Sequence, residues 1–421
     1  MSVSDWIGAA FVALLLITAG VALITALPTP EKNTARTHYV LSFVASLVLL
    51  AAYWNHSAIY GMQGFPYSDD RTYHVQGQSL AESGNLANAW TSEDRNPGFV
   101  VWTAVVYRIF GPSTIIVRLF NICFRCLWIA PIAFLAVLYK DPKVTRIAIR
   151  LVAWAPSAML ISLLHVKDVL ASLGFLCAIA AIAYMGRSRF ALPLLAGSAV
   201  LLWGVREDLL LLIAPLACIF AVRSMRQRGR RWGGILVLVC AGLFVAITVP
   251  LLLDSWILTT YKTSLLTQVF EYTNRNAVAA HGLAPLMIRS VSDFWKLPFS
   301  MTAELVLPFP PDFSAADIFP VANGFASLFV LALLPFVFAG CMTSMRKWTM
   351  SSLPAYGGFL GCAALLAVVF PGTSRYREQL IGLFCLLAAL GIRHWRSHKY
   401  LVAGSAFCIG CALAAGTAMY L

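Results

Sequence analysis

The feature that constrains this chain most is a series of long apolar runs without charged residues. The first run, Trp6–Ala26, contains no Asp, Glu, Lys or Arg. A helix needs about 20 apolar residues to cross the roughly 30 Å hydrocarbon core of a bilayer. Because 60% of the 421 residues are apolar and only 12% are charged, a water-soluble fold could not bury the apolar surface. The sequence therefore predicts an all-α protein that crosses a membrane many times.

The hydropathy pattern predicts about twelve spans. They lie near residues 6–26, 39–59, 113–139, 151–165, 168–185, 190–203, 208–222, 233–253, 321–341, 352–370, 378–392 and 400–420. We expect the first to be a retained span rather than a signal peptide, because no Lys or Arg precedes it. The short segments 151–165 and 168–185 could form a broken pair instead of two full crossings.

Charged residues are divided unevenly between the two sides of this predicted topology. With the N-terminus outside, 18 of the 31 Lys and Arg residues fall in loops on the inner side, and 16 of the 18 acidic residues fall outside. Because cytoplasmic loops are enriched in Lys and Arg, the basic side is predicted to face the cytoplasm. The formal net charge of +13 then reflects topology, and nucleic-acid binding need not be invoked.

Two external segments are long, 60–112 and 254–320. In the first, Pro97–Phe110 is apolar and aromatic but too short to span, so we expect an interfacial helix that starts at Pro97 and stops before Gly111. The second is predicted to be a mostly helical cap followed by an extended, proline-rich stretch.

Two adjacent carboxylates, Asp69 and Asp70, stand in the first external segment. A structural interpretation is that Ser68 or an Asp opens a helix with an acidic first turn. A chemical interpretation is that one acid is a general base and the other orients it or binds a cation, with Tyr73 nearby. We favour the chemical interpretation.

Further ionisable residues lie at the predicted outer ends of later spans. The set is Arg118, Lys167, Asp168, Arg206, Arg375, Tyr376 and Arg377. Structural alternatives are snorkelling side chains at Lys167–Asp168 and a charged turn at Arg206. Arginines outside oppose the positive-inside trend, and their guanidinium groups suit a phosphate, which they bind in a bidentate manner. Arg125 lies deeper, and we interpret it as a buried structural ion.

Helices can gather these outer ends around one site at the level of the lipid headgroups. In such a site an acid would deprotonate an acceptor hydroxyl, and the cations would hold a leaving phosphate. This combination favours transfer of a sugar from a polyprenyl-phosphate donor.

The same residues resemble motifs of the GT-C superfamily of polytopic glycosyltransferases, which includes protein O-mannosyltransferases and the lipid A aminoarabinose transferase. Asp69-Asp70-Arg71-Thr72-Tyr73 resembles the catalytic acid pattern of their first external loop, and Asn96-Pro97-Gly98 resembles the segment that follows it. Arg118-Leu119, Lys167-Asp168 and Arg375-Tyr376-Arg377 resemble later motifs in the same order. The chain departs from the family in an extra first span and in lacking the large C-terminal domain of some members, so the acceptor is not carried over.

The resemblance implies a role for each motif. Asp69 would be the catalytic base, and Asp70 would orient the site, contact Lys167, or bind a divalent cation (Mg²⁺ or Mn²⁺) together with Asp69. Residues expected to bind substrate are Arg71, Tyr73, Arg118, Lys167, Asp168, Arg206, Arg375, Tyr376 and Arg377. The expected partners are a polyprenyl-phosphate-linked sugar donor, a glycan, lipid or protein acceptor, and membrane lipid. The site would face the outside or periplasm of the cytoplasmic (inner) membrane.

The resemblance also implies a division of the chain. Residues 1–38 would be an extra N-terminal span and loop, 39–260 the catalytic transmembrane module, 261–320 an external cap, and 321–421 the C-terminal transmembrane helices.

Two other functions fit parts of the pattern. A lipid-linked oligosaccharide flippase would favour ionisable residues in the middle of spans and inverted repeats, which are not visible here. An O-antigen-type polymerase or ligase would share the lipid-linked donor and the outward-facing site, but would depend on external arginines and histidine rather than on an acid pair.

Overall fold

The computed structural model describes residues 3–27, 29–59, 68–91, 96–227, 288, 291–306, 318–346, 353–369 and 377–418. Over these ranges the chain forms helices joined by turns and contains no strand, which confirms the all-α class. The α-helices are α1 (Val3–Thr25), α2 (Lys32–Ile59), α3 (Ser68–Ser83), α4 (Asn88–Thr91), α5 (Pro97–Phe110), α6 (Thr114–Leu127), α7 (Ile129–Val137), α8 (Pro142–Ala153), α9 (Pro156–Ile161), α10 (Asp168–Ala183), α11 (Ala191–Val205), α12 (Leu210–Gln227), α15 (Leu297–Val306), α16 (Ile318–Arg346), α17 (Leu353–Val369), α18 (Glu378–His394) and α19 (Lys399–Ala418). Short 3-10 helices are η1 (Glu207–Leu209), η4 (Val291–Lys296) and η6 (Trp395–His398).

Five segments of the described chain are long and apolar enough to cross a membrane. They are Ile7–Thr25, Lys32–Asn55, Thr114–Val137, Gly324–Arg346 and Glu378–Cys411. Shorter apolar helices are Pro97–Phe110, Asp168–Ala183, Ala191–Val205 and Leu353–Ala367. These segments support a membrane protein, whereas the total of twelve spans stays a prediction. The predicted span 233–253 and most of the predicted cap lie outside the described residues.

The predicted span 151–165 is wrong as a continuous helix. Helix α8 ends at Ala153, the short helix α9 begins at Pro156, and residues 162–167 are not helical. Pro156 explains the break, because it has no N–H to donate and disfavours helical geometry at the residue before it. Ala155 accordingly has an extended backbone, with ψ at 113°. The alternative of a broken pair describes this region better, and the non-helical residues 162–167, which follow α9, form the turn that carries His165 and Lys167.

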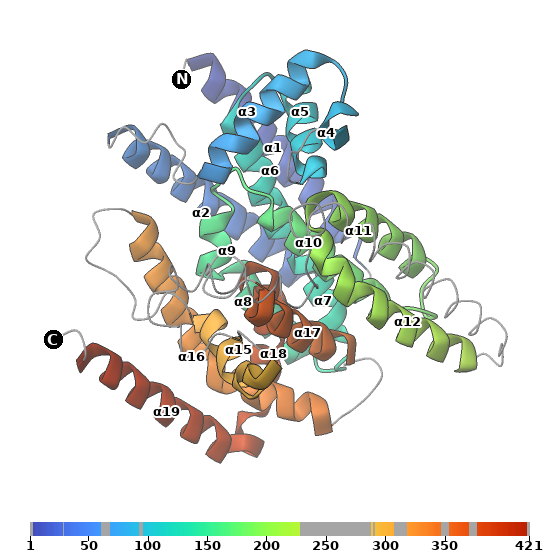
Figure 1. The fold of residues 1–421 in the computed structure, drawn as a ribbon, viewed down its shortest axis with the longest axis vertical. Helices are drawn as coiled ribbons and strands as arrows, with labels where there is room; N and C mark the ends of the chain where they lie inside the picture. The colour runs from blue at the N-terminus through green and yellow to red at the C-terminus, as the bar shows by residue number, and fades with distance from the viewer. Residues whose placement is uncertain are drawn as a thin grey trace.

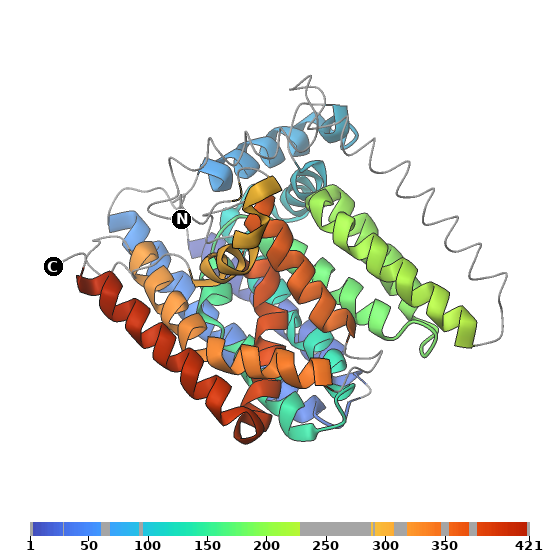
Figure 2. The same ribbon diagram turned by 60° about the horizontal axis from the view of Figure 1, so that its bottom comes forward.

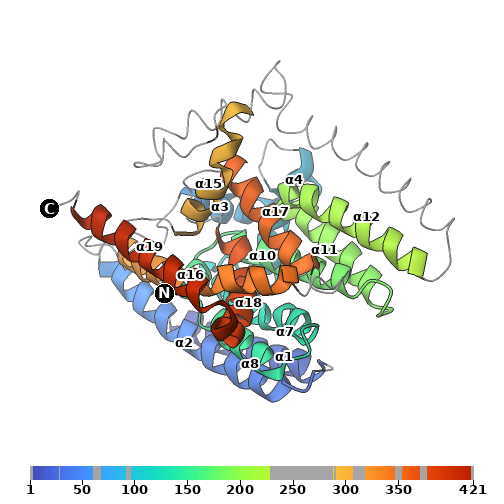
Figure 3. The same ribbon diagram turned by 90° about the horizontal axis from the view of Figure 1, so that it is seen from below.

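The helices form one bundle with a small group of helices across one end. Figure 1 shows α3, α4 and α5 grouped at that end, and Figure 2 shows α3 lying across the bundle rather than along it. Figure 3 shows α18 in the middle of the bundle, among α7, α8, α10, α16 and α17. All residues of α18 from Glu378 to Gly391 are buried, as expected for a central helix.

Small residues let α3 and α5 approach each other and the bundle. A Cβ atom on Gly77 of α3 would lie 2.3 Å from Cγ2 of Thr103 in α5, and one on Gly98 would lie 2.7 Å from the backbone of Gly204 in α11. Neither position could carry a larger side chain without displacing its neighbour. Helix α5 has the bounds predicted for the interfacial helix and ends before Gly111, whose φ is 82°.

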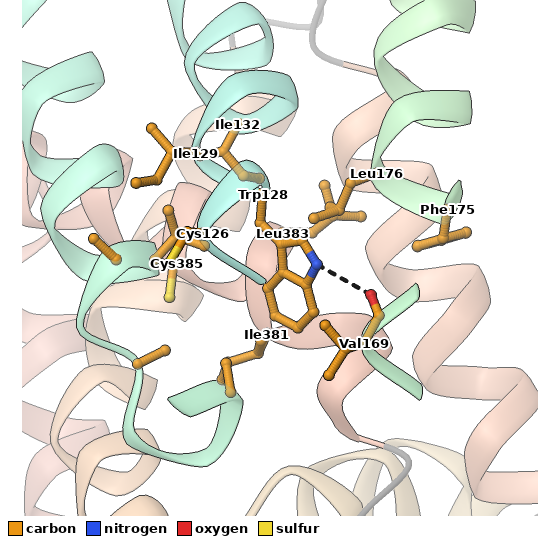
Figure 4. Packing of buried hydrophobic residues seen from close by; sticks show 14 of the residues in the cluster. Cys126, Trp128, Ile129, Ile132, Val169, Phe175, Leu176, Ile381, Leu383 and Cys385 are labelled. Carbon is orange, nitrogen blue, oxygen red and sulfur yellow. Dashed lines mark hydrogen bonds between the residues drawn. The ribbon is translucent and has the colours of Figure 1, made fainter. Parts of the chain in front are cut away.

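A tryptophan joins the middle of the bundle to the start of α10. Trp128, between α6 and α7, is fully buried, and its indole Nε1 donates a hydrogen bond to the carbonyl of Val169 at 3.2 Å. Figure 4 shows the ring among Leu176 from α10 and Ile381 and Leu383 from α18. This packing fixes the first turn of α10, which carries Asp168.

Candidate functional site

The two adjacent acids begin helix α3, as the sequence predicts, but their environments differ. Asp69 and Asp70 both lie in the first turn of the helix, where its dipole favours negative charge. Asp69 is half-buried, whereas Asp70 is completely buried. An accessible acid therefore stands beside one that the protein encloses.

Asp70 is held from two sides. Its Oδ2 lies 3.4 Å from Nη2 of Arg118 in α6, and its Oδ1 accepts a hydrogen bond of 2.8 Å from the backbone N–H of His165. The Arg118 guanidinium is also buried and lies about 5.5 Å from the ring centroids of Tyr53 and Trp54. A buried carboxylate needs such partners, because an uncompensated charge in this position is strongly destabilising.

His165 links the acid to helix α5. The side chain is buried, and its Nε2 lies 3.1 Å from Oγ1 of Thr103, the residue packed on Gly77. Burial, followed by the nearby charges of Arg118 and His74, holds the pKa of His165 well below its usual value. This shift favours the neutral form of the ring. A series of contacts therefore runs from Gly77 in α3 to Thr103 in α5, from Thr103 to the His165 ring, and from the His165 backbone N–H to Asp70.

His74 and Tyr107 complete the surroundings of Asp70. His74 follows Asp70 by four residues and therefore lies on the same face of α3, and its Nδ1 lies 2.7 Å from the hydroxyl of Tyr107. Burial and then Arg118 lower the pKa of His74. No role was predicted for His74, Thr103 or Tyr107. The spacing of four from Asp70 to His74 is the one sequence signal that could have indicated a member of this cluster.

Lys167 and Tyr73, both predicted to bind substrate, meet at a third residue. The Lys167 ammonium donates a hydrogen bond to Oδ1 of Asn96, and Nδ2 of Asn96 donates to the Tyr73 hydroxyl at 2.9 Å. Tyr73 is buried and packs edge-on against Phe99, with ring centroids 5.0 Å apart. Asn96 thus connects α3 to the 162–167 turn. The sequence indicated this residue only through the Asn96-Pro97-Gly98 motif.

Asp168 and Arg206 form a second buried ion pair next to Lys167. Nη1 of Arg206 lies 2.9 Å from Oδ1 of Asp168, and its Nε lies 3.2 Å from Oδ1 of Asp208. Glu207 is half-buried, and burial and then Asp208 raise its pKa, while Lys167 acts in the opposite direction. The structure therefore brings together Asp70, Tyr73, Arg118, Lys167, Asp168 and Arg206, all of which were predicted.

The remaining predicted residues differ in position. Arg71 is exposed on α3. Arg377 was predicted to lie at the level of the lipid headgroups and to be open to a phosphate, and the structure corrects this. Its side chain is buried, with Nη1 3.3 Å from the Ser327 hydroxyl and Nε 3.7 Å from Oε1 of Glu378, because α18 begins inside the bundle. Arg375 and Tyr376 lie outside the described residues.

The donor atoms around the acid pair do not fit the divalent cation that the resemblance implied. Both oxygens of Asp70 already accept from Arg118 and His165. Among the described residues, no three His, Cys, Asp or Glu side chains come together in a metal-binding arrangement. The positive charge beside the pair comes from the guanidinium group of Arg118.

Comparisons with known proteins add no family to this picture. No protein-family model matches the chain, and no curated protein matches it.

Proposed function

We propose that this protein is an integral membrane glycosyltransferase that moves a sugar from a polyprenyl-phosphate donor to a glycan, lipid or protein acceptor on the outer face of the cytoplasmic membrane. The observation that carries the proposal is the split acid pair. Asp69 is accessible enough to meet a substrate, while Asp70 is anchored to Arg118 and His165, beside further cations.

In the proposed reaction, Asp69 accepts the proton of an acceptor hydroxyl as its oxygen forms a bond to the anomeric carbon of the sugar. The bond from that carbon to the phosphate oxygen breaks, and its electron pair stays on the leaving polyprenyl phosphate. A cation such as Lys167 would stabilise the charge that develops on the phosphate. Asp70 does not take part in proton transfer in this mechanism, because its oxygens hold Arg118 and the backbone of the 162–167 turn.

The apolar helices support the membrane part of the proposal, since a polyprenyl chain of the donor is soluble only in lipid. The common position of Asp70, Lys167 and Asp168 supports one site rather than several separate charged turns. A flippase would instead favour charges in the middle of spans.

The decisive test is Asp69→Asn in purified protein reconstituted in lipid nanodiscs. An amide has nearly the same shape as a carboxylate but cannot accept the proton, so we expect transfer to fall by about 10²–10⁴-fold. The free energy of unfolding should fall by less than about 1 kcal/mol, because Asp69 is half-buried and loses its interaction with the helix dipole. Glu82→Gln is the matched control, since Glu82 is an exposed acid on the same helix, and it should transfer at the wild-type rate.

The donor and acceptor would be identified by mass analysis of envelope glycans from cells with and without the protein. A panel of polyprenyl-phosphate sugars then provides the assay. Retention of more than about a tenth of the wild-type rate in Asp69→Asn would show that the acid pair is structural, because loss of a general base costs far more.

A further inference from the structure

The end of the bundle opposite the candidate site carries a basic surface of its own. Tyr53 and Trp54, near the end of α2, lie against Arg118 at the candidate site. Lys32 begins α2 and is about 33 Å from Trp54 along the helix axis, at 1.5 Å per residue. The start of α2 therefore lies at the other end of the bundle, where helix α8 packs against it (Figure 3).

Helix α8 is amphipathic, and its basic residues lie on the exposed side. The exposed residues recur at spacings of three and four, which place them on one face of the helix. They are Lys143, Arg146, Arg150 and, just past the end of the helix, Trp154. The opposite face is apolar and buried within the bundle. An exposed face that combines basic residues with a tryptophan is typical of contact with anionic lipid.

Two polar contacts join this face to α2, one before Arg150 in the chain and one after it. Nε of Arg146 lies 2.8 Å from Oε2 of Glu31, the residue that precedes α2. The indole Nε1 of Trp154 donates a hydrogen bond of 3.1 Å to Nδ1 of His38 in α2. The guanidinium group of Arg150 is close enough to the His38 ring to interact with it electrostatically. Arg150 therefore lies where α2 and α8 meet.

The contact with Trp154 determines which nitrogen of His38 can donate. An indole N–H can only donate a hydrogen bond, so Nδ1 of His38 accepts it and the proton of the neutral ring is on Nε2. His38 thus contributes an N–H donor beside the guanidinium group of Arg150, which also only donates. Neighbouring donors of this kind match the several oxygens of a phosphate group.

The position of this cluster along α2 favours a lipid over a free anion. The candidate span Lys32–Asn55 belongs to α2, and His38 is six residues, or about 9 Å, from its start. This level is close to the boundary between headgroups and hydrocarbon, where an arginine extends towards the phosphates and tryptophan is enriched. The exposed ring of Trp154 would then pack against the glycerol and upper acyl chains of a lipid.

We propose that Arg150, His38 and Trp154 bind the phosphodiester of an anionic phospholipid, in the leaflet at the end of the bundle opposite α3. The headgroup is anionic because a zwitterionic one would bring an ammonium group to a surface that is already positive. Phosphatidylglycerol has the required chemistry, since its phosphodiester carries no compensating cation. The bound lipid contacts both α2 and α8, so it stabilises the folded bundle. This inference is independent of the proposed glycosyltransferase function.

The test uses the purified full-length protein at about 0.15 M salt. Native mass spectrometry during titration with phosphatidylglycerol or phosphatidylcholine measures the two affinities, and thermal unfolding in nanodiscs of each lipid measures the stabilisation. We expect wild type to bind phosphatidylglycerol more tightly and to unfold at a higher temperature in its presence. Arg150→Gln should weaken phosphatidylglycerol binding by about fivefold or more, because it removes a charge at the level of the phosphates.

Lys143→Gln is the matched control, since it removes the same charge from the same exposed face of α8. Lys143 lies about 10 Å from Arg150 along the helix, which exceeds the Debye length of about 8 Å at this salt concentration. Its replacement should therefore change the affinity for phosphatidylglycerol by less than about twofold. Trp154→Phe keeps an aromatic ring but removes the N–H that fixes the tautomer of His38, and it should weaken binding less than Arg150→Gln does.

Several outcomes would overturn the inference. Equal losses in Lys143→Gln and Arg150→Gln would show that the basic surface attracts anionic membranes without a defined site. Equal binding of the two lipids to wild type would show that the net charge of the headgroup is not recognised. Displacement of phosphatidylglycerol by millimolar inorganic phosphate would identify a site for a free anion. Wild-type binding by Trp154→Phe would exclude the hydrogen bond to His38 from the site.

Discussion

Two arginines on helix α6 show how differently the end of the bundle that α3 covers and the middle of the bundle use the same side chain. Arg118 and Arg125 are seven residues apart on one helix, and both are buried. Arg118 meets the carboxylate of Asp70 at the end of the bundle that α3 covers. Arg125 lies deeper, and its Nη1 and Nη2 donate to the carbonyls of Ala153 and Ser42, at 2.6 and 3.0 Å.

The partners of the two arginines distinguish a side chain at the candidate site from one that connects helices. Ala153 is the last residue of α8, so its carbonyl has no partner within the helix, and a cation at a helix C-terminus is favourable. Arg125 also donates to the Ser46 hydroxyl of α2, and it thereby joins α2, α6 and α8. Arg125 is buried, as the interpretation of a buried structural ion requires, and its structural role stays a prediction. Arg118 instead contacts an acid beside the accessible Asp69.

The largest effect is expected from Arg118→Met, which removes one partner of the buried pair. Asp70 would keep its charge in a buried position, so the free energy of unfolding should fall by about 3–5 kcal/mol and transfer should be lost. Adding Asp70→Asn removes the uncompensated charge, so the double variant should recover part of the stability. Thermal and denaturant unfolding in detergent would measure this cycle. Additive effects of the two changes would mean that the pair does not couple, and the contrast with Arg125 would then disappear.

A smaller effect is expected from Arg125→Met. The substitution fills much of the volume but leaves the carbonyl of Ala153 without this donor, which should lower the free energy of unfolding by about 1–3 kcal/mol. The carbonyl of Ser42 keeps a hydrogen bond of 2.9 Å from the Ser46 hydroxyl. The specific activity of the folded fraction should stay within about twofold of wild type, because Arg125 donates to the backbone and to Ser46 rather than to Asp70. Turnover normalised to folded protein is the measurement. A loss of transfer greater than that of stability would place Arg125 in the functional site.

The smallest effect concerns pH and comes from His74 and His165, at the end of the bundle that α3 covers. Burial and then Arg118 lower the pKa of both rings from 6.5, so below that pH the folded state binds fewer protons than the unfolded state. Stability should therefore rise with pH through this window and be lost as pH falls. For the half-exposed His74 we expect less than about 1 kcal/mol after solvent screening.

Unfolding measured between about pH 5 and pH 7.5 would reveal this dependence. His74→Gln keeps a hydrogen-bonding group near Tyr107 but cannot take up the proton, so its stability should vary less with pH than that of wild type. Arg125→Met should keep the wild-type pH dependence, because it leaves both histidines in place. An unchanged pH dependence in His74→Gln would show that protonation of His74 does not contribute to the pH dependence of stability.

Local signals in the sequence were sufficient for several helices. Pro97 and Gly111 set the bounds of α5, and the acidic first turn marked the start of α3. The predicted span 151–165 failed because hydropathy measures apolar content and is insensitive to the hydrogen bond that Pro156 cannot donate. That failure mattered, since the predicted span also covered residues 162–165 of the non-helical turn 162–167, which carries His165 and Lys167 and leads to Asp168.

In the candidate site, too, some features could be predicted from the sequence and others could not. Asp70, Lys167, Asp168 and Arg206 could be predicted, because a charged side chain next to a long apolar run is costly unless it has a purpose. Which side chain each of them contacts could not be predicted. Asn96 lies 71 residues from Lys167 in the chain, and Arg118 lies 48 from Asp70.

The sequence by itself determined that this is an apolar, all-helical chain with its acids and several cations at the ends of apolar runs, because composition and periodicity act locally. Only the tertiary structure decided which charge meets which. The close approach of Gly77 to Thr103 and of Gly98 to Gly204 sets where α3 and α5 rest, and so where Asp70 and Asn96 point. Packing of this kind depends on contacts between distant segments, which no local pattern specifies. The burial that separates Asp70 from Asp69, neighbours in the chain, is its most direct result.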